Sequence, residues 1–298
     1  MNLLRKCYDM TDFRIGHSYQ HDKLEHDDLT VMYFLFYCGG FYDKIRKQEV
    51  AQMIPRERVL EKLDGLLRRN DYAGAKRLLQ YWLSEAENTG DDQGMLLMQN
   101  ELMGLCRKLG EKEQALQYAQ DALLQVSKME IAENVGAATT YLNSATVCKA
   151  FGMPEDALNL FSMAQEIYER ELPPADDRLG GLYNNMGLAL VDLKRFREAE
   201  TIYQKALSVM AQTPDKEPEL AITYLNMATA VEMEHGMDHP LIPALAQKAR
   251  ECMDIGKYRT DGNYAFVCEK CATVFGYYGF EDYARELQAR CGRIYEGT

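Results

Sequence analysis

The chain has 298 residues, of which 47% are hydrophobic, so it can bury a large core and is not expected to be disordered. Its 46 acidic residues outnumber its 34 basic residues, which gives a formal net charge of −12. This balance argues against nucleic acid as the main partner, because phosphate binding requires clustered positive charge. Eight cysteines are too sparse for a disulfide scaffold and form no paired zinc-binding pattern. We therefore expect a reducing, cytoplasmic location and no metal site.

The sequence predicts neither a secretory leader nor a membrane span. Met1 opens a polar stretch that charged residues interrupt every few positions, unlike the apolar core of a signal peptide. The longest apolar run, residues 29–37, is too short to cross a bilayer. We expect a soluble protein without a membrane partner.

Residues 1–55 are expected to form a leader followed by a helical cap. Two helices are predicted, at 27–37 and 41–53, and Pro55 opens the next one. A cap over the first repeat is the favoured interpretation, because terminal repeats need covering. A homodimer contact and a DNA-binding helix-turn-helix are the alternatives, the last disfavoured by seven basic against eight acidic residues. Six aromatic residues of this segment require burial: Tyr33, Phe34, Phe36, Tyr37, Phe41 and Tyr42.

Three histidines of the leader stand among acidic residues. His17 and His21 are four residues apart, the spacing at which two histidines on a helix can share a metal, and His26 follows. No helix start or apolar face accompanies them. We interpret this stretch as a polar leader.

A pattern of small and large residues repeats about every 42 residues from Pro55 onward. In its clearest copy an aromatic, Tyr183, and a small residue, Gly187, precede Ala199, Tyr203 and Ala206. With Tyr183 counted as position 4, position 20 falls at residues 75, 115, 157, 199, 242 and 284. Small residues at positions 8, 20 and 27 allow two helices to cross closely, and larger residues fill the space between pairs. The pattern predicts stacked helix pairs, with Gly110 in a turn between two helices.

The pattern resembles the tetratricopeptide repeat, and its long period is similar to that of kinesin light chains. The resemblance implies an all-α fold, a right-handed superhelical solenoid of about six helix pairs. The first helix of each pair would line a concave groove. The predicted repeats are 56–93, 94–132, 133–175, 176–216, 217–260 and 261–298, and residues 281–296 would form the closing helix.

Asparagine occupies position 6 in three successive repeats, as Asn143, Asn185 and Asn226. The family frame places this position on the groove, where the three side chains would form a ladder. A carboxamide both donates and accepts, so it can hold the backbone of an extended peptide. The alternative is that these asparagines bond within the array. Further groove positions that the frame assigns to peptide binding are Asn184, Thr146, Lys149, Thr229 and Arg107.

No catalytic residue or cofactor is predicted, because nucleotide-binding, zinc-protease and serine-hydrolase motifs are missing from the sequence. The single CxxC, Cys268 and Cys271, falls on packing positions of a helix, so we expect core cysteines. The predicted function is a non-catalytic scaffold that binds a protein or peptide. Two alternatives are a peptide-responsive regulator of the bacterial quorum-sensing type and a self-associating adaptor.

Overall fold

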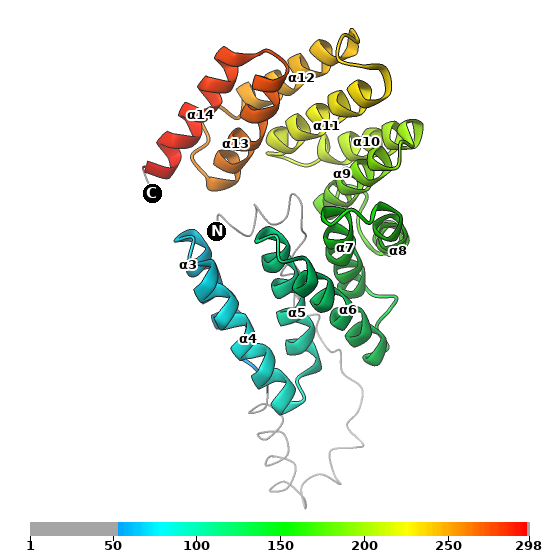
Figure 1. Ribbon diagram of the computed structural model, residues 1–298, viewed down its shortest axis with the longest axis vertical. Helices are drawn as coiled ribbons and strands as arrows, with labels where there is room; N and C mark the ends of the chain where they lie inside the picture. The colour runs from blue at the N-terminus through cyan, green and yellow to red at the C-terminus, as the bar shows by residue number, and fades with distance from the viewer. Residues whose placement is uncertain (1–52, 297–298) are drawn as a thin grey trace, which may run out of the picture.

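The computed structural model describes residues 53–296, which form twelve α-helices and no strand (Figure 1). The all-α prediction is therefore confirmed for this part of the chain. The predictions made for residues 1–52, including the cap, the aromatic cluster, the histidines and the homodimer contact, lie outside the described residues. The first helices are α3 (Arg56–Arg68), α5 (Asp92–Lys108), α7 (Val135–Ala150), α9 (Asp177–Asp192), α11 (Glu217–His235) and α13 (Gly262–Tyr277). The second helices are α4 (Tyr72–Thr89), α6 (Lys112–Lys128), α8 (Pro154–Glu171), α10 (Phe196–Met210), α12 (Leu241–Ile255) and α14 (Glu281–Glu296).

Each first helix packs against the second helix that follows it, and the six pairs stack into a curved solenoid (Figure 1). The predicted helical repeat architecture is confirmed. The handedness of the superhelix and the repeat boundaries stay predictions. The long period has two sources in the structure: most helices have 15 to 19 residues, and segments such as 129–134 and 211–216 join successive pairs.

The first helices line the inner side of the curve (Figure 1). Contacts join α5 to α7, α7 to α9, α9 to α11 and α11 to α13, whereas successive second helices of the described part make at most marginal contact. Elements on the inside of a bend lie closer together than those on the outside. We use the term inner face for the side of the array along which these first helices contact one another.

Helix ends are fixed by local side chains and by glycine. The Asp91 carboxylate caps α5 by accepting a 2.9 Å bond from Gly94 N, and Asn134 Oδ1 caps α7 at 2.8 Å from Ala137 N. These bonds satisfy amides that have no partner within the helix. After α5 the chain turns through Gly110, whose φ of +73° is left-handed. Glycine adopts this conformation without strain, in agreement with the predicted turn.

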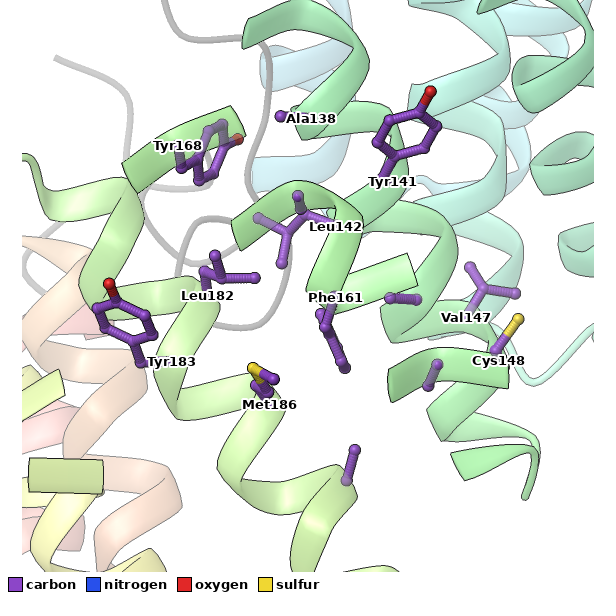
Figure 2. Close-up of a cluster of buried hydrophobic side chains, with 14 of the residues drawn as sticks. Ala138, Tyr141, Leu142, Val147, Cys148, Phe161, Tyr168, Leu182, Tyr183 and Met186 are labelled. Atoms are coloured by element: carbon purple, nitrogen blue, oxygen red, sulfur yellow. The ribbon is translucent and has the colours of Figure 1, made fainter. Parts of the chain in front are cut away.

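The core confirms the role predicted for the small residues. Ala157 and Ala199 are fully buried, and Gly187 of α9 lies directly against the Tyr203 ring of α10. A Cβ at position 187 would lie 2.4 Å from Tyr203 Cε1, so only glycine permits this crossing. Figure 2 shows part of the core, where Phe161 of α8 lies between side chains of α7 and α9.

Candidate functional site on the inner face

The eight predicted binding residues lie on four successive first helices. Their distribution follows the repeat: Arg107 is on α5; Asn143, Thr146 and Lys149 are on α7; Asn184 and Asn185 are on α9; Asn226 and Thr229 are on α11.

Asn143 joins two neighbouring repeats. Its Nδ2 donates a 2.9 Å hydrogen bond to Oδ1 of Asn100, which lies 43 residues earlier on α5. Asn100 Nδ2 in turn donates to Thr140 Oγ1 on α7 at 3.1 Å and to Leu96 O at 2.9 Å. All of these side chains are buried. The amide group of Asn143 is therefore used between repeats and is not available to a ligand.

Asn226 repeats this arrangement two helix pairs later, and Asn185 does not. Asn226 Nδ2 donates to Oδ1 of Asn184 at 3.0 Å, across the contact of α11 with α9. Asn185 has Leu142 where the other two have an asparagine partner, so its Nδ2 donates to Gly181 O of its own helix at 3.0 Å. The three position-6 asparagines thus make two different kinds of contact. The sequence analysis missed the partner role of Asn100, although its spacing of 43 residues from Asn143 was a usable signal.

The side-chain carbonyl oxygens of these three asparagines accept no hydrogen bond from the described residues. Asn143 Oδ1 is buried and accepts no hydrogen bond. Within residues 53–296, no hydrogen bond reaches Oδ1 of Asn185 or Asn226 either. A buried acceptor without a donor costs about 1–3 kcal/mol of desolvation free energy.

The remaining predicted residues are held by neighbours. Thr146 Oγ1 donates to Asn143 O at 2.7 Å, and Thr229 Oγ1 donates to Leu225 O at 3.2 Å. Lys149 Nζ lies 3.7 Å from Oδ2 of Asp192, an ion pair between α7 and α9. Arg107 is half-buried near the end of α5. The Asp192 carboxylate therefore neutralises part of the charge of Lys149.

A tyrosine–carboxylate cluster extends the inner face from α11 to α13. Tyr277 Oη donates to Glu232 Oε1 at 2.5 Å, and Tyr278 Oη lies 2.9 Å from Glu232 Oε2 and 3.3 Å from Thr229 Oγ1. Burial raises the pKa of Tyr278 to about 12, and the Glu232 carboxylate adds to this shift while the Thr229 bond opposes it. The sequence analysis missed this cluster, although Tyr277 stands at position 13 of the sixth repeat, which the family frame places on the groove.

Burial varies along the inner face. Residues 94–106 of α5 and 137–148 of α7 are buried on every side of their helices. On α11, by contrast, Asn226, Thr229 and Glu232 are only half-buried, and Tyr277 of α13 is 59% exposed. The inner face is therefore most accessible to a ligand at α11 and α13.

The cysteine pair lies in the core, as predicted. Cys268 and Cys271 are buried in α13, and burial raises the pKa of the Cys268 thiol to about 11 and that of Cys271 further. Neither forms a thiolate near neutral pH. Among residues 53–296, no group of three histidine, cysteine or acidic side chains is arranged to hold a metal. In the same part of the chain, no helix combines the length and apolar character that a membrane span requires.

Comparison with known proteins finds one matching family model and several solved structures of similar fold. The family model described as the tetratricopeptide repeat matches residues 178–237, from α9 to α11. The tetratricopeptide repeat match thus covers this segment, and the helical repeat fold extends over the rest of the described residues. No curated protein matches the sequence.

Solved structures share the architecture at low sequence identity. A Rap protein complexed with the competence and sporulation factor is 14% identical, with a TM-score of 0.59 over 92% of this chain and 77% of that one. BtubC (BKLC) from P. vanneervenii is 20% identical, with a TM-score of 0.56 over 74% and 84%. NprR in complex with its cognate peptide NprX is 17% identical, with a TM-score of 0.53 over 87% and 72%. At such identities the likeness concerns the fold alone.

Proposed function

We propose that the inner face binds an extended segment of another protein, or a free peptide, without catalysing a reaction. The observation that carries this proposal is the half-buried Asn226 of α11, whose Oδ1 accepts no hydrogen bond from the described residues. Oδ1 of Asn185 and of Asn143, on the two preceding first helices, accepts none either. A peptide backbone supplies N–H donors at regular intervals and satisfies such acceptors whatever its sequence.

The asparagine ladder takes a specific form in this proposal. The amide groups of Asn143 and Asn226 hold neighbouring repeats together, and the carbonyl oxygens receive the ligand. Asn184, Thr146, Lys149, Thr229 and Arg107 would contact the ligand's side chains. Because the array is preformed, binding costs mainly the ordering of the ligand. We expect entry at α11 and α13, where the inner face is most exposed.

Two solved structures of the same fold support a peptide ligand. The Rap protein and NprR are each described in complex with a peptide or signalling factor. The non-catalytic character is proposed because the sequence has no nucleotide-binding, zinc-protease or serine-hydrolase motif. Burial also raises the pKa of Cys268 and Cys271, which disfavours a thiolate nucleophile at this pair. A cytoplasmic location belongs to the same proposal.

A peptide-responsive regulator is the second candidate function. The specific observation in its favour is that Asn143 is both a rung of the ladder and the bond between α5 and α7. A ligand that occupies its oxygen acts on a side chain that fixes the spacing of two repeats. Such a ligand would bias the curvature of the array through its differential affinity for two arrangements.

Capture of partners by full-length wild-type protein and by Asn185→Ala tests the proposal. Asn185 is the suitable rung, because its amide bonds only within its own helix. Asn88→Ala, an exposed asparagine of the second helix α4, is the matched control. Quantitative mass spectrometry of material retained from lysate should show a partner held by wild type and control. Asn185→Ala should bind it about 1–3 kcal/mol more weakly. Equal retention by all three proteins, at equal melting temperature, would overturn the asparagine ladder.

A further inference from the structure

A cavity of about 720 Å³ lies at the C-terminal end of the array, apart from the asparagines of the inner face. One wall is the connection between α12 and α13, with Lys257, Tyr258 and Arg259. The other wall is α14, with Arg290 and Arg293. The volume is in the range of small-molecule sites, about 300–1,000 Å³.

Two arginines of the cavity are fixed and neutralised. Arg290 is 5% exposed, and its Nη2 donates to Asp254 at 2.7 Å and to Glu286 at 2.6 Å. Arg259 Nε donates to Asp261 Oδ2 at 2.9 Å, and its Nη1 donates to Asp215 O at 2.9 Å. These bonds give the cavity rigid walls but leave little net charge on either arginine.

The other two basic residues of the cavity are not neutralised by acidic side chains of the described residues. Lys257 and Arg293 form no ion pair with any residue in the described part of the chain. They come from separate elements, the connection after α12 and the last turn of α14, and both are exposed. In a chain with a net charge of −12, two cations without acidic partners that line one cavity leave a local positive potential. An anion bound in the cavity would be attracted by both side chains.

An aromatic ring accompanies these charges. Tyr258 is 84% exposed, and Lys257 Nζ lies 5.1 Å from the centre of its ring. Ile294 adds an apolar surface from α14. Glu286 also lines the cavity, where it is paired with Arg290, and Asp254 is the second acidic partner of that arginine; these carboxylates would repel an extended polyanion. A small ligand with one anionic end and a flat apolar body fits these surroundings.

We propose that this cavity binds a small aromatic phosphate of the nucleotide type. Its phosphate lies between Lys257 and Arg293, and its ring stacks on Tyr258. The proposal is independent of the peptide-binding function, because the cavity shares no residue with the asparagine ladder or its neighbours.

Isothermal titration calorimetry of the full-length protein tests this site with AMP, adenosine and inorganic phosphate as probes. At fixed low salt, AMP should bind saturably, and each of the two fragments should bind at least tenfold more weakly. Arg293→Glu and Lys257→Glu should each weaken AMP binding at least tenfold, whereas Arg58→Glu, an exposed arginine on α3, should not. Tyr258→Ala should weaken AMP binding and leave the weak phosphate binding unchanged.

Two results would overturn the proposal. One is the lack of saturable AMP binding at millimolar concentration. The other is binding that Arg293→Glu and Lys257→Glu both retain at wild-type strength. The four substituted side chains are exposed, so the variants should fold, and equal melting temperatures would verify this.

Discussion

Asn143 Nδ2 and Asn100 Oδ1 lie 2.9 Å apart and join the first helices of two successive repeats, α7 and α5. Asn226 and Asn184 make the same bond between α11 and α9. Between α7 and α9 the bond is missing, because Leu142 stands where an asparagine would be needed. Repeats that share one sequence pattern are thus connected in two different ways.

Asn100→Ala should destabilise the array. The substitution removes the acceptor of Asn143 Nδ2 and leaves that donor buried without a partner, at a cost of about 1–3 kcal/mol. Asn185→Ala removes only a bond within one helix and should cost about 1 kcal/mol or less. Urea unfolding of both variants, followed by circular dichroism, measures the difference. Equal losses of unfolding free energy would contradict the assigned role of the inter-repeat bond.

Gly187→Ala should also be destabilising, for a steric reason. The added methyl would overlap the fully buried Tyr203 ring, so α9 and α10 would have to separate, at about 1–3 kcal/mol. Gly65→Ala on α3 is the matched control, because a Cβ there meets no atom within 4 Å. That control should be neutral or stabilising by up to about 1 kcal/mol, since alanine favours helix. Coincident thermal melting curves for Gly187→Ala and Gly65→Ala would contradict the tight crossing of α9 and α10.

The sequence predicted those features that repeat, such as the small residue at Gly187 opposite an aromatic. A position that recurs every 42 residues reports a constraint that every helix pair shares. The partner of Asn143 was not predicted, although Asn100 stands 43 residues before it. Leu142 interrupts the series one repeat later, and asparagine returns at this position only at Asn184. The cavity was not predicted either, because Lys257 and Arg293 stand on separate elements and form no sequence motif.

The cysteines Cys268 and Cys271 should resist alkylation in the folded protein. Both are buried, and burial raises the pKa of Cys268 to about 11. At pH 8, iodoacetamide therefore cannot reach the thiols and finds no thiolate to react with. Mass spectrometry should find both unmodified in buffer and both alkylated in urea. Rapid modification under native conditions would show that the pair is a reactive dithiol instead of core packing.

Alkaline pH should weaken the α11–α13 contact through Tyr278. An unfolded tyrosine has a pKa of about 10, whereas burial raises the folded value to about 12. The folded state therefore holds the proton more tightly, and the stability this provides is complete below pH 10 and lost as the pH rises to 12. Tyr278→Phe cannot ionise, so its melting temperature should fall less than that of the wild type between pH 10 and 12. Parallel curves for the two proteins would contradict this prediction.

Photo-cross-linking tests the central claim, that ligands bind the inner face, most directly. Benzoylphenylalanine replaces either Tyr277 on the inner first helix α13 or Tyr81 on the second helix α4. The two tyrosines are similarly exposed, at 59% and 57%. After irradiation with the captured partner, we expect a cross-linked peptide from position 277 and none from position 81. Cross-links from position 81 alone would contradict the claim and place the partner on the outer helices.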